Sequence, residues 1–216
     1  LKALTEQAMA GTVKFSRNLA QTITKAIEMI DGKISRQLAE IMHHEKFLKI
    51  EGSWRGLNYL VMNSETGENL KIRVLNITKR QLLNDFAKAT EFDQSMLFKK
   101  IYENEFGTPG GEPYGCMVGD YEFSNHPDDI ELLRGLSGVA AASFAPFISA
   151  ASAKMFDVGD FRDLKEVRDL KKGFEGGKYI GWRGLRDSED SKFLCLTMPR
   201  ALARVPYGKD TKPIEE

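Results

Sequence analysis

The order of apolar and polar positions changes character once along the chain, within residues 51–63. Before this stretch, apolar residues recur every three or four positions from Leu19 to Ile41, while Lys25, Glu28 and Arg36 occupy other faces. A 3.6-residue period of this kind predicts an amphipathic helix. We therefore expect an N-terminal helical arm over residues 1–50, with a bend or a boundary between two helices at Gly32, where glycine weakens a helix interior by about 1 kcal/mol.

One face of this arm carries a continuous apolar stripe that needs a partner. Its members are Leu19, Ile23, Ile27, Ile30, Ile34 and Leu38. The stripe can pack on the rest of its own chain, or it can dock on another subunit. The pattern alone leaves both interpretations open.

The stretch EGSWRGLNYLVMN, residues 51–63, joins the arm to a body of different periodicity. Its aromatic and aliphatic residues are dense, and burying each large one is worth about 1.5 to 3 kcal/mol. We predict a buried structural junction built from Trp54, Leu57 and Tyr59, in which Arg55 makes local polar contacts.

Short β-branched segments and helical segments alternate over residues 51–208. The predicted strands are 70–78, 114–121, 144–149 and 192–198, and the predicted helices begin at a capping box at Thr78, near Asp93, at Pro127 and at Asp160. Strand and helix in alternation indicate a mixed α/β domain, with a mainly parallel sheet flanked by helices. Residues 209–216 show no pattern of a helix or strand, so we expect a truncated tail there. Because the sequence also begins at Leu1 without Met, we expect it to be a piece of a longer protein.

Composition excludes some classes of partner and function. Thirty-one basic and 31 acidic residues give a formal net charge of zero, so no net field would hold the chain on nucleic acid or on an anionic membrane. Cys116 and Cys195 lie in apolar, strand-like runs, which predicts buried thiols in a reducing compartment. No basic and then apolar leader opens the sequence.

Candidate chemistry is sparse. The nearest match to a phosphate loop, around Gly176 and Gly177, has Lys172 where the first glycine is required and Tyr179 in place of Ser or Thr. Asp120 and His126 lie in the most site-like acidic cluster, after a predicted strand, but helix capping also explains His126. We therefore predict no catalytic residue, cofactor or metal, and keep a metal-dependent α/β enzyme as an alternative.

Charges of both signs alternate in the segment from 181 to 208. They favour an ion-pair network or a subunit contact, because the guanidinium group of arginine pairs with carboxylates through two parallel hydrogen bonds. The candidates are Arg183, Arg186, Glu189 and Asp190.

Several segments together resemble one known family. The stretches EGSWRGLNYLV, EFDQS, GGEPYG, VGDYEF and RDSEDSKFLCLTMPRALARVPYG are similar, in the same order, to the large subunit of the contractile sheath of bacterial type VI secretion, the TssC/VipB-like family. The resemblance covers essentially the whole chain and corresponds to the N-terminal part of that subunit.

The resemblance implies a structural and mechanical role in the bacterial cytoplasm, with a fold related to phage tail sheath proteins. It implies pairing with a small sheath subunit, stacking with neighbouring protomers around an inner tube, and later disassembly by an AAA+ unfoldase whose recognition element we expect to be missing here. The family brings no catalytic residues. A tail sheath protein of another contractile particle remains the alternative.

Overall fold

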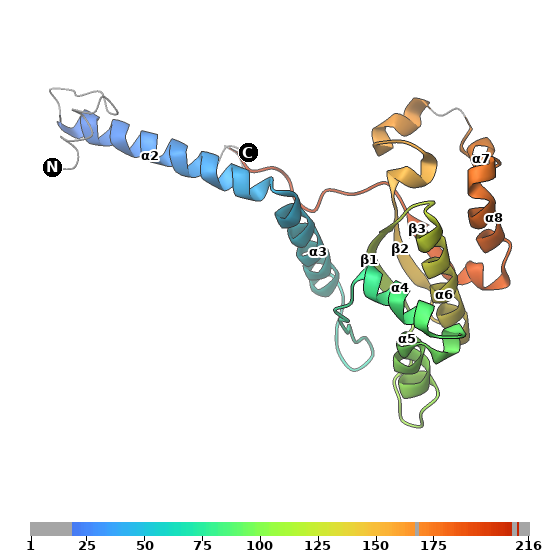
Figure 1. Ribbon diagram of the computed structural model, residues 1–216. Helices are drawn as coiled ribbons and strands as arrows, with labels where there is room; N and C mark the ends of the chain where they lie inside the picture. Colours follow the sequence, from blue (N-terminus) through green and yellow to red (C-terminus); the bar gives the residue numbers. More distant parts are fainter. Residues whose placement is uncertain (1–18, 167–168, 209–210, 212–216) are drawn as a thin grey trace. The chain divides into compact units, whose positions relative to one another are not determined.

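The computed structural model describes residues 19–166, 169–208 and 211 (Figure 1). Four parts of the sequence predictions lie outside these residues: positions 1–18 of the arm, the side chain of Leu19, positions 167 and 168 of the helix predicted from Asp160, and the tail at 209–216 apart from Thr211. Contacts within the chain divide it into two compact units, residues 1–72 with 201–216, and residues 73–200. We call them the arm unit and the sheet unit.

The arm unit contains two helices, α2 (Leu19–Met42) and α3 (Glu45–Met62). The predicted arm helix is present, and it continues through Gly32 as one helix, so the boundary between two helices expected there is absent. The break comes at His43 and His44 instead, where the Nδ1 atom of His44 accepts a hydrogen bond from the backbone N–H of Lys46 and caps α3. Helix α3 runs on through residues 51–62, so the stretch predicted as a junction is helical.

The sheet unit alternates helices and short strands. In chain order they are α4 (Lys79–Lys88), η1 (Phe92–Gln94), α5 (Met96–Phe98), η2 (Lys99–Phe106), β1 (Met117–Phe123), α6 (Pro127–Ala142), β2 (Phe147–Ala151), η3 (Ala153–Phe156), η4 (Phe161–Glu166), α7 (Leu170–Gly173), η5 (Gly177–Tyr179), α8 (Ile180–Arg186), η6 (Glu189–Phe193) and β3 (Leu194–Thr197). The capping box forms at Thr78 with Gln81, and Pro127 opens α6 as predicted.

Three parallel strands form one sheet in the order β1-β2-β3. Phe147 of β2 pairs with Met117 of β1 and with Leu194 of β3, which fixes the register. Helix α6 contacts all three strands, and α4 and α8 contact α6 in turn. The predicted mixed fold, a parallel sheet flanked by helices, is confirmed.

The core of the sheet unit lies between the sheet and α6. Phe123, Leu133 and Val139 have no exposed surface, and Leu132 and Leu136 are 1% exposed. Side chains along β1 alternate, with Met117 and Tyr121 turned toward this core and Val118 71% exposed on the opposite face. The same alternation leaves Cys195 exposed between Leu194 and Leu196, and Cys116, just before β1, is exposed too. The prediction of buried thiols is wrong.

Three predicted elements differ from the structure. The helix expected to begin near Asp93 is divided into the 3-10 helix η1, the short α-helix α5 and the π-helix η2. No strand forms over residues 70–78, because no described segment pairs with it. The helix predicted from Asp160 to Lys172 is a 3-10 helix, η4, and a separate short helix, α7. In the described residues, no helix combines the length and the apolar character that a bilayer crossing requires.

Candidate partner-binding surfaces

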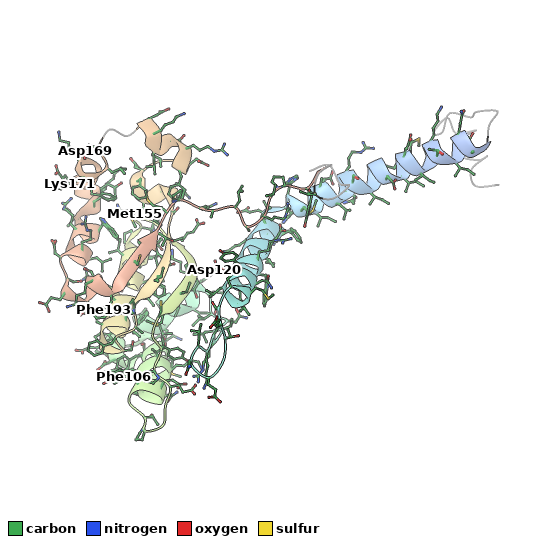
Figure 2. All side chains as sticks on the ribbon, turned by 180° about the vertical axis from the view of Figure 1, so that it is seen from behind. Phe106, Asp120, Met155, Asp169, Lys171 and Phe193 are labelled. Atoms are coloured by element: carbon green, nitrogen blue, oxygen red, sulfur yellow. The ribbon has the colours of Figure 1, made fainter. Side chains whose placement is uncertain are left out.

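The apolar stripe predicted on the arm lies in the open on α2. Ile23, Ile27, Ile30 and Ile34 are between 41% and 55% exposed, and Leu38 is 37% exposed. Side chains project from this helix along its described length (Figure 2). Five large apolar side chains on one face of a helix are a candidate docking surface, since an apolar helix face of this kind is one of the recurring features by which proteins bind a partner.

The apolar residues of α3 are exposed too, which corrects the predicted burial of the junction. Trp54 and Tyr59 are 65% and 72% exposed, and Leu57 is only half-buried. The reason lies in their spacing, because Phe47, Trp54 and Leu57 share one face while Tyr59 and Leu60 lie on others. Such a helix exposes apolar surface on several sides, and the described part of the arm unit does not cover them.

Two charged residues connect α3 to the C-terminal segment of the arm unit. The Nε atom of Arg204 donates to Oε1 of Glu51 at 2.7 Å, and both side chains are 14% exposed. Arg55, one helical turn along, donates to the same oxygen at 2.8 Å and to the hydroxyl of Tyr207 at 3.1 Å. The guanidinium group of Arg204 lies 4.1 Å from the centre of the Tyr207 ring. We call this group, Glu51, Arg55, Arg204 and Tyr207, the clamp.

The clamp alters the acidity of its carboxylate. The hydrogen bond from Arg204 lowers the pKa of Glu51 below its ordinary value, and the bond from Arg55 adds to this, because both stabilise the charged form. Arg55 was predicted to make local polar contacts, and it does. The contact between Glu51 and Arg204 was not predicted, since 153 positions separate them and no local pattern joins them.

The four charged candidates near the C-terminus do not pair with one another in the described residues. Nη1 of Arg183 donates to the backbone carbonyls of Phe174 and Gly176 at 2.8 and 2.9 Å, so this side chain holds the loop before α8. Arg186, Glu189 and Asp190 are exposed. Arg200, in the same charged segment, pairs with Glu122 of β1 at 2.6 Å.

The acidic cluster after β1 has structural uses. His126 caps α6 by accepting from the N–H of Asp128 at 3.3 Å. Asp129 accepts from the backbone N–H and hydroxyl of Ser124 and pairs with Lys79 at 2.6 Å. Asp120 lies on β1 and its side chain is exposed (Figure 2). Over the residues that the structure describes, no three metal-ligating side chains come together.

Depressions on the sheet unit offer little for a small ligand. One, of about 440 Å³, lies beside the start of α6 and is lined by Asn125, Pro127, Ile130 and Lys178, among others. None of these groups is arranged around a nucleophile or a paired acid and base. Exposed helix faces, rather than a pocket, are therefore the candidate functional surfaces.

Comparison with known proteins identifies the family of the chain. Residues 24–216 match the family model VipB, described as "EvpB/VC_A0108, tail sheath N-terminal domain". The chain is also 50% identical, over 219 aligned residues, to the type VI secretion system sheath protein TssC1 of Pseudomonas aeruginosa. That alignment covers 100% of this chain and 44% of the relative, so the chain spans less than half the length of the protein it matches.

Proposed function

The chain belongs to the VipB tail sheath N-terminal domain family, and from this premise we propose that it serves as part of a structural subunit of a contractile sheath in type VI secretion. The resemblance found in the sequence is thereby confirmed at the level of the family. The observation that carries the proposal for this chain is the stripe on α2, five apolar side chains exposed on one helix face. A sheath protomer requires such surfaces, because a helical lattice is held together by repeated contacts between subunits.

In this proposal a small sheath subunit binds to the stripe, and the two proteins form a heterodimer. Burying a fully exposed Ile or Leu is worth about 1.5 to 3 kcal/mol, and the stripe residues, at 37% to 55% exposed, would each contribute about half of that before the costs of association are subtracted. Heterodimers then stack with neighbouring protomers around an inner tube in the bacterial cytoplasm, and contraction drives the tube outward. An AAA+ unfoldase disassembles the contracted sheath.

Charged side chains supply a second class of contact in this proposal. Arg186, Glu189 and Asp190 are exposed and form ion pairs with a neighbouring protomer, whereas Arg183 is already engaged with backbone carbonyls. Exposed ion pairs stabilise a contact by about 0 to 1 kcal/mol each. They therefore adjust the affinity between subunits, while the apolar stripe supplies most of it. We assign the chain no catalytic role.

The test is co-purification of this chain with its candidate small sheath subunit. Changing Ile23, Ile30 and Ile34 together to Asp should abolish the complex, because three charges would have to be buried in an apolar contact. The matched control makes the same change of three charge units on the opposite side of the helix, with Gln21→Asp and Lys25→Asp, at exposed positions about 140° or more from the middle of the stripe. The control should retain the complex.

Circular dichroism of both variants checks that α2 stays helical. Unchanged co-purification of the stripe variant would refute the docking role of α2. Equal loss in both variants would assign the effect to charge or to helix stability rather than to the stripe.

A further inference from the structure

Residues 73–77, Arg73-Val74-Leu75-Asn76-Ile77, have the sequence of a strand without forming one. Their β-branched and apolar residues favour strand structure, and no turn or bend interrupts the chain between residues 70 and 78. Val74 and Leu75 are 69% and 46% exposed. We call these five residues the unpaired segment.

The backbone of this segment has no hydrogen-bond partner within the described part of the chain until Ile77. The backbone N–H and C=O groups of Arg73, Val74, Leu75 and Asn76 form no bond there, and the carbonyl of Ile77 accepts only from a side chain. Backbone groups of a folded protein are almost always paired or hydrated. Exposed, unpaired strand-like backbone with apolar side chains is the template to which another strand adds.

Side chains fix the unpaired segment in place at both ends. Arg73 pairs with Glu105, pairs with Glu112 at 2.6 Å, and lies within 3.3 Å of the Tyr114 hydroxyl. At the other end, the hydroxyl of Tyr121 donates to the carbonyl of Ile77 at 2.6 Å, and Ile77 packs against the core. A segment held in this way loses less conformational entropy when a strand pairs with it.

We propose that the unpaired segment is completed by a β-strand from the part of the full-length sheath protein that has no counterpart in this chain. The matched relative supplies that length, because this chain covers 44% of it and the family model is an N-terminal domain. A strand on the same polypeptide acts at an effective concentration on the order of millimolar, so it outcompetes a strand from a separate protein. The inference rests on the proposed membership of a longer sheath subunit but not on pairing with the small subunit.

The test is amide hydrogen exchange on the full-length Pseudomonas aeruginosa relative and on the same protein cut back to the stretch that matches this chain, both without other sheath proteins. We expect the amides equivalent to Val74, Leu75 and Asn76 to exchange freely in the short form. In the full-length form, those that face the partner strand should be protected by about 100-fold or more. The amides equivalent to Ile148 and Ser149, in the central strand, serve as the internal control and should be protected in both.

Proline substitutions test whether the protection comes from hydrogen bonds along one edge of the segment. Successive N–H groups of a strand point to opposite edges, so proline at only one of the positions equivalent to Val74 and Leu75 removes a bond to the partner. One variant should lose the protection of its neighbours and the other should keep it.

Equal exchange in the two forms, or protection that survives both prolines, would overturn the proposal. So would protection that appears only when the small sheath subunit is added, because the strand would then come from that subunit. Co-purification with the small subunit tests the proposed function separately, and either result can fail while the other stands.

Discussion

Helices α2 and α6 contain similar proportions of apolar residues, but most apolar side chains of α6 are buried and most of those of α2 are exposed. Leu133 and Val139 of α6 have no exposed surface, because the sheet, α4 and α8 surround that helix. Ile27, Ile30 and Ile34 of α2 remain more than half exposed. An apolar pattern therefore tells which residues should leave water, but not which molecule covers them. In the sheet unit the cover is in the same chain, and in the arm unit we propose that it is another protein.

The largest contrast should come from truncating one buried and one exposed side chain. Leu133→Ala should lower the free energy of unfolding by about 2 to 5 kcal/mol, because it leaves a cavity in the core. Ile34→Ala should change it by no more than about 0.5 kcal/mol in the isolated chain. Urea unfolding followed by circular dichroism measures both. A loss at Ile34 equal to that at Leu133 would mean that α2 is already covered in solution.

Glycines in the two helices should respond with opposite signs. A Cβ atom at Gly135 of α6 would lie 2.9 Å from the ring of Phe86, so Gly135→Ala should destabilise the chain by roughly 1 to 2 kcal/mol. A Cβ atom at Gly32 of α2 would meet no atom within 4 Å among the described residues beyond the backbone of its own helix, so Gly32→Ala should stabilise the helix by about 0.5 to 1 kcal/mol.

Thermal unfolding of the two glycine variants gives the signs directly. Adding Phe86→Leu to Gly135→Ala should recover part of the loss if the ring is the cause. Equal shifts of the same sign in Gly32→Ala and Gly135→Ala would contradict the contrast.

Helix caps provide a smaller comparison. Thr78 caps α4 through a reciprocal pair of bonds with Gln81, so Thr78→Ala should cost about 1 kcal/mol. His44 caps α3 through one hydrogen bond of 3.3 Å, and His44→Ala should lower the free energy of unfolding by only a few tenths of the loss expected for Thr78→Ala. Chemical denaturation of the two variants compares them, and a larger loss at His44 would show that the turn between α2 and α3 is more tightly held than its contacts indicate.

The smallest effect should be the pH response of the clamp. Because the folded pKa of Glu51 is depressed, its contribution to stability is complete above the pKa that it has in the unfolded chain. That contribution is lost as pH falls through the folded value. It should amount to no more than about 1 kcal/mol, since the contact lies near the surface.

Nuclear magnetic resonance of the Arg204 side-chain Nε–H should follow this titration. Glu51→Gln should remove the response, while Glu45→Gln, at an acid outside the clamp, should leave it intact. If the Arg204 Nε–H signal of the unaltered chain did not change with pH, the ion pair between Glu51 and Arg204 would be excluded in solution.

Local signals predicted three of the helices well. The stripe from Ile23 to Leu38 gave α2, the Thr78 box gave the start of α4, and Pro127 with two following acids gave α6. In each case the information lies within a few residues, where helical hydrogen bonds form.

Long-range features were predicted poorly. The strand expected over residues 70–78 has the right composition, but a strand also needs a partner, and none lies in the described residues. Trp54 and Tyr59 were expected to be buried because of their size, yet burial depends on neighbours. The contact of Glu51 with Arg204 joins residues 153 positions apart, and no pattern in either neighbourhood indicates it. The candidate interface residues on α2 stay predictions, since their exposure identifies no partner.

The interruption at His43 and His44 turns α2 into a lever. With 24 residues in that helix, the rise per residue of about 1.5 Å gives a rod of about 36 Å. A rotation of about 10° at the two histidines would move the far end of this rod by about 6 Å, without breaking a hydrogen bond inside either helix. A small change of angle at this turn is therefore amplified along α2, and the apolar side chains farthest from the histidines move the most.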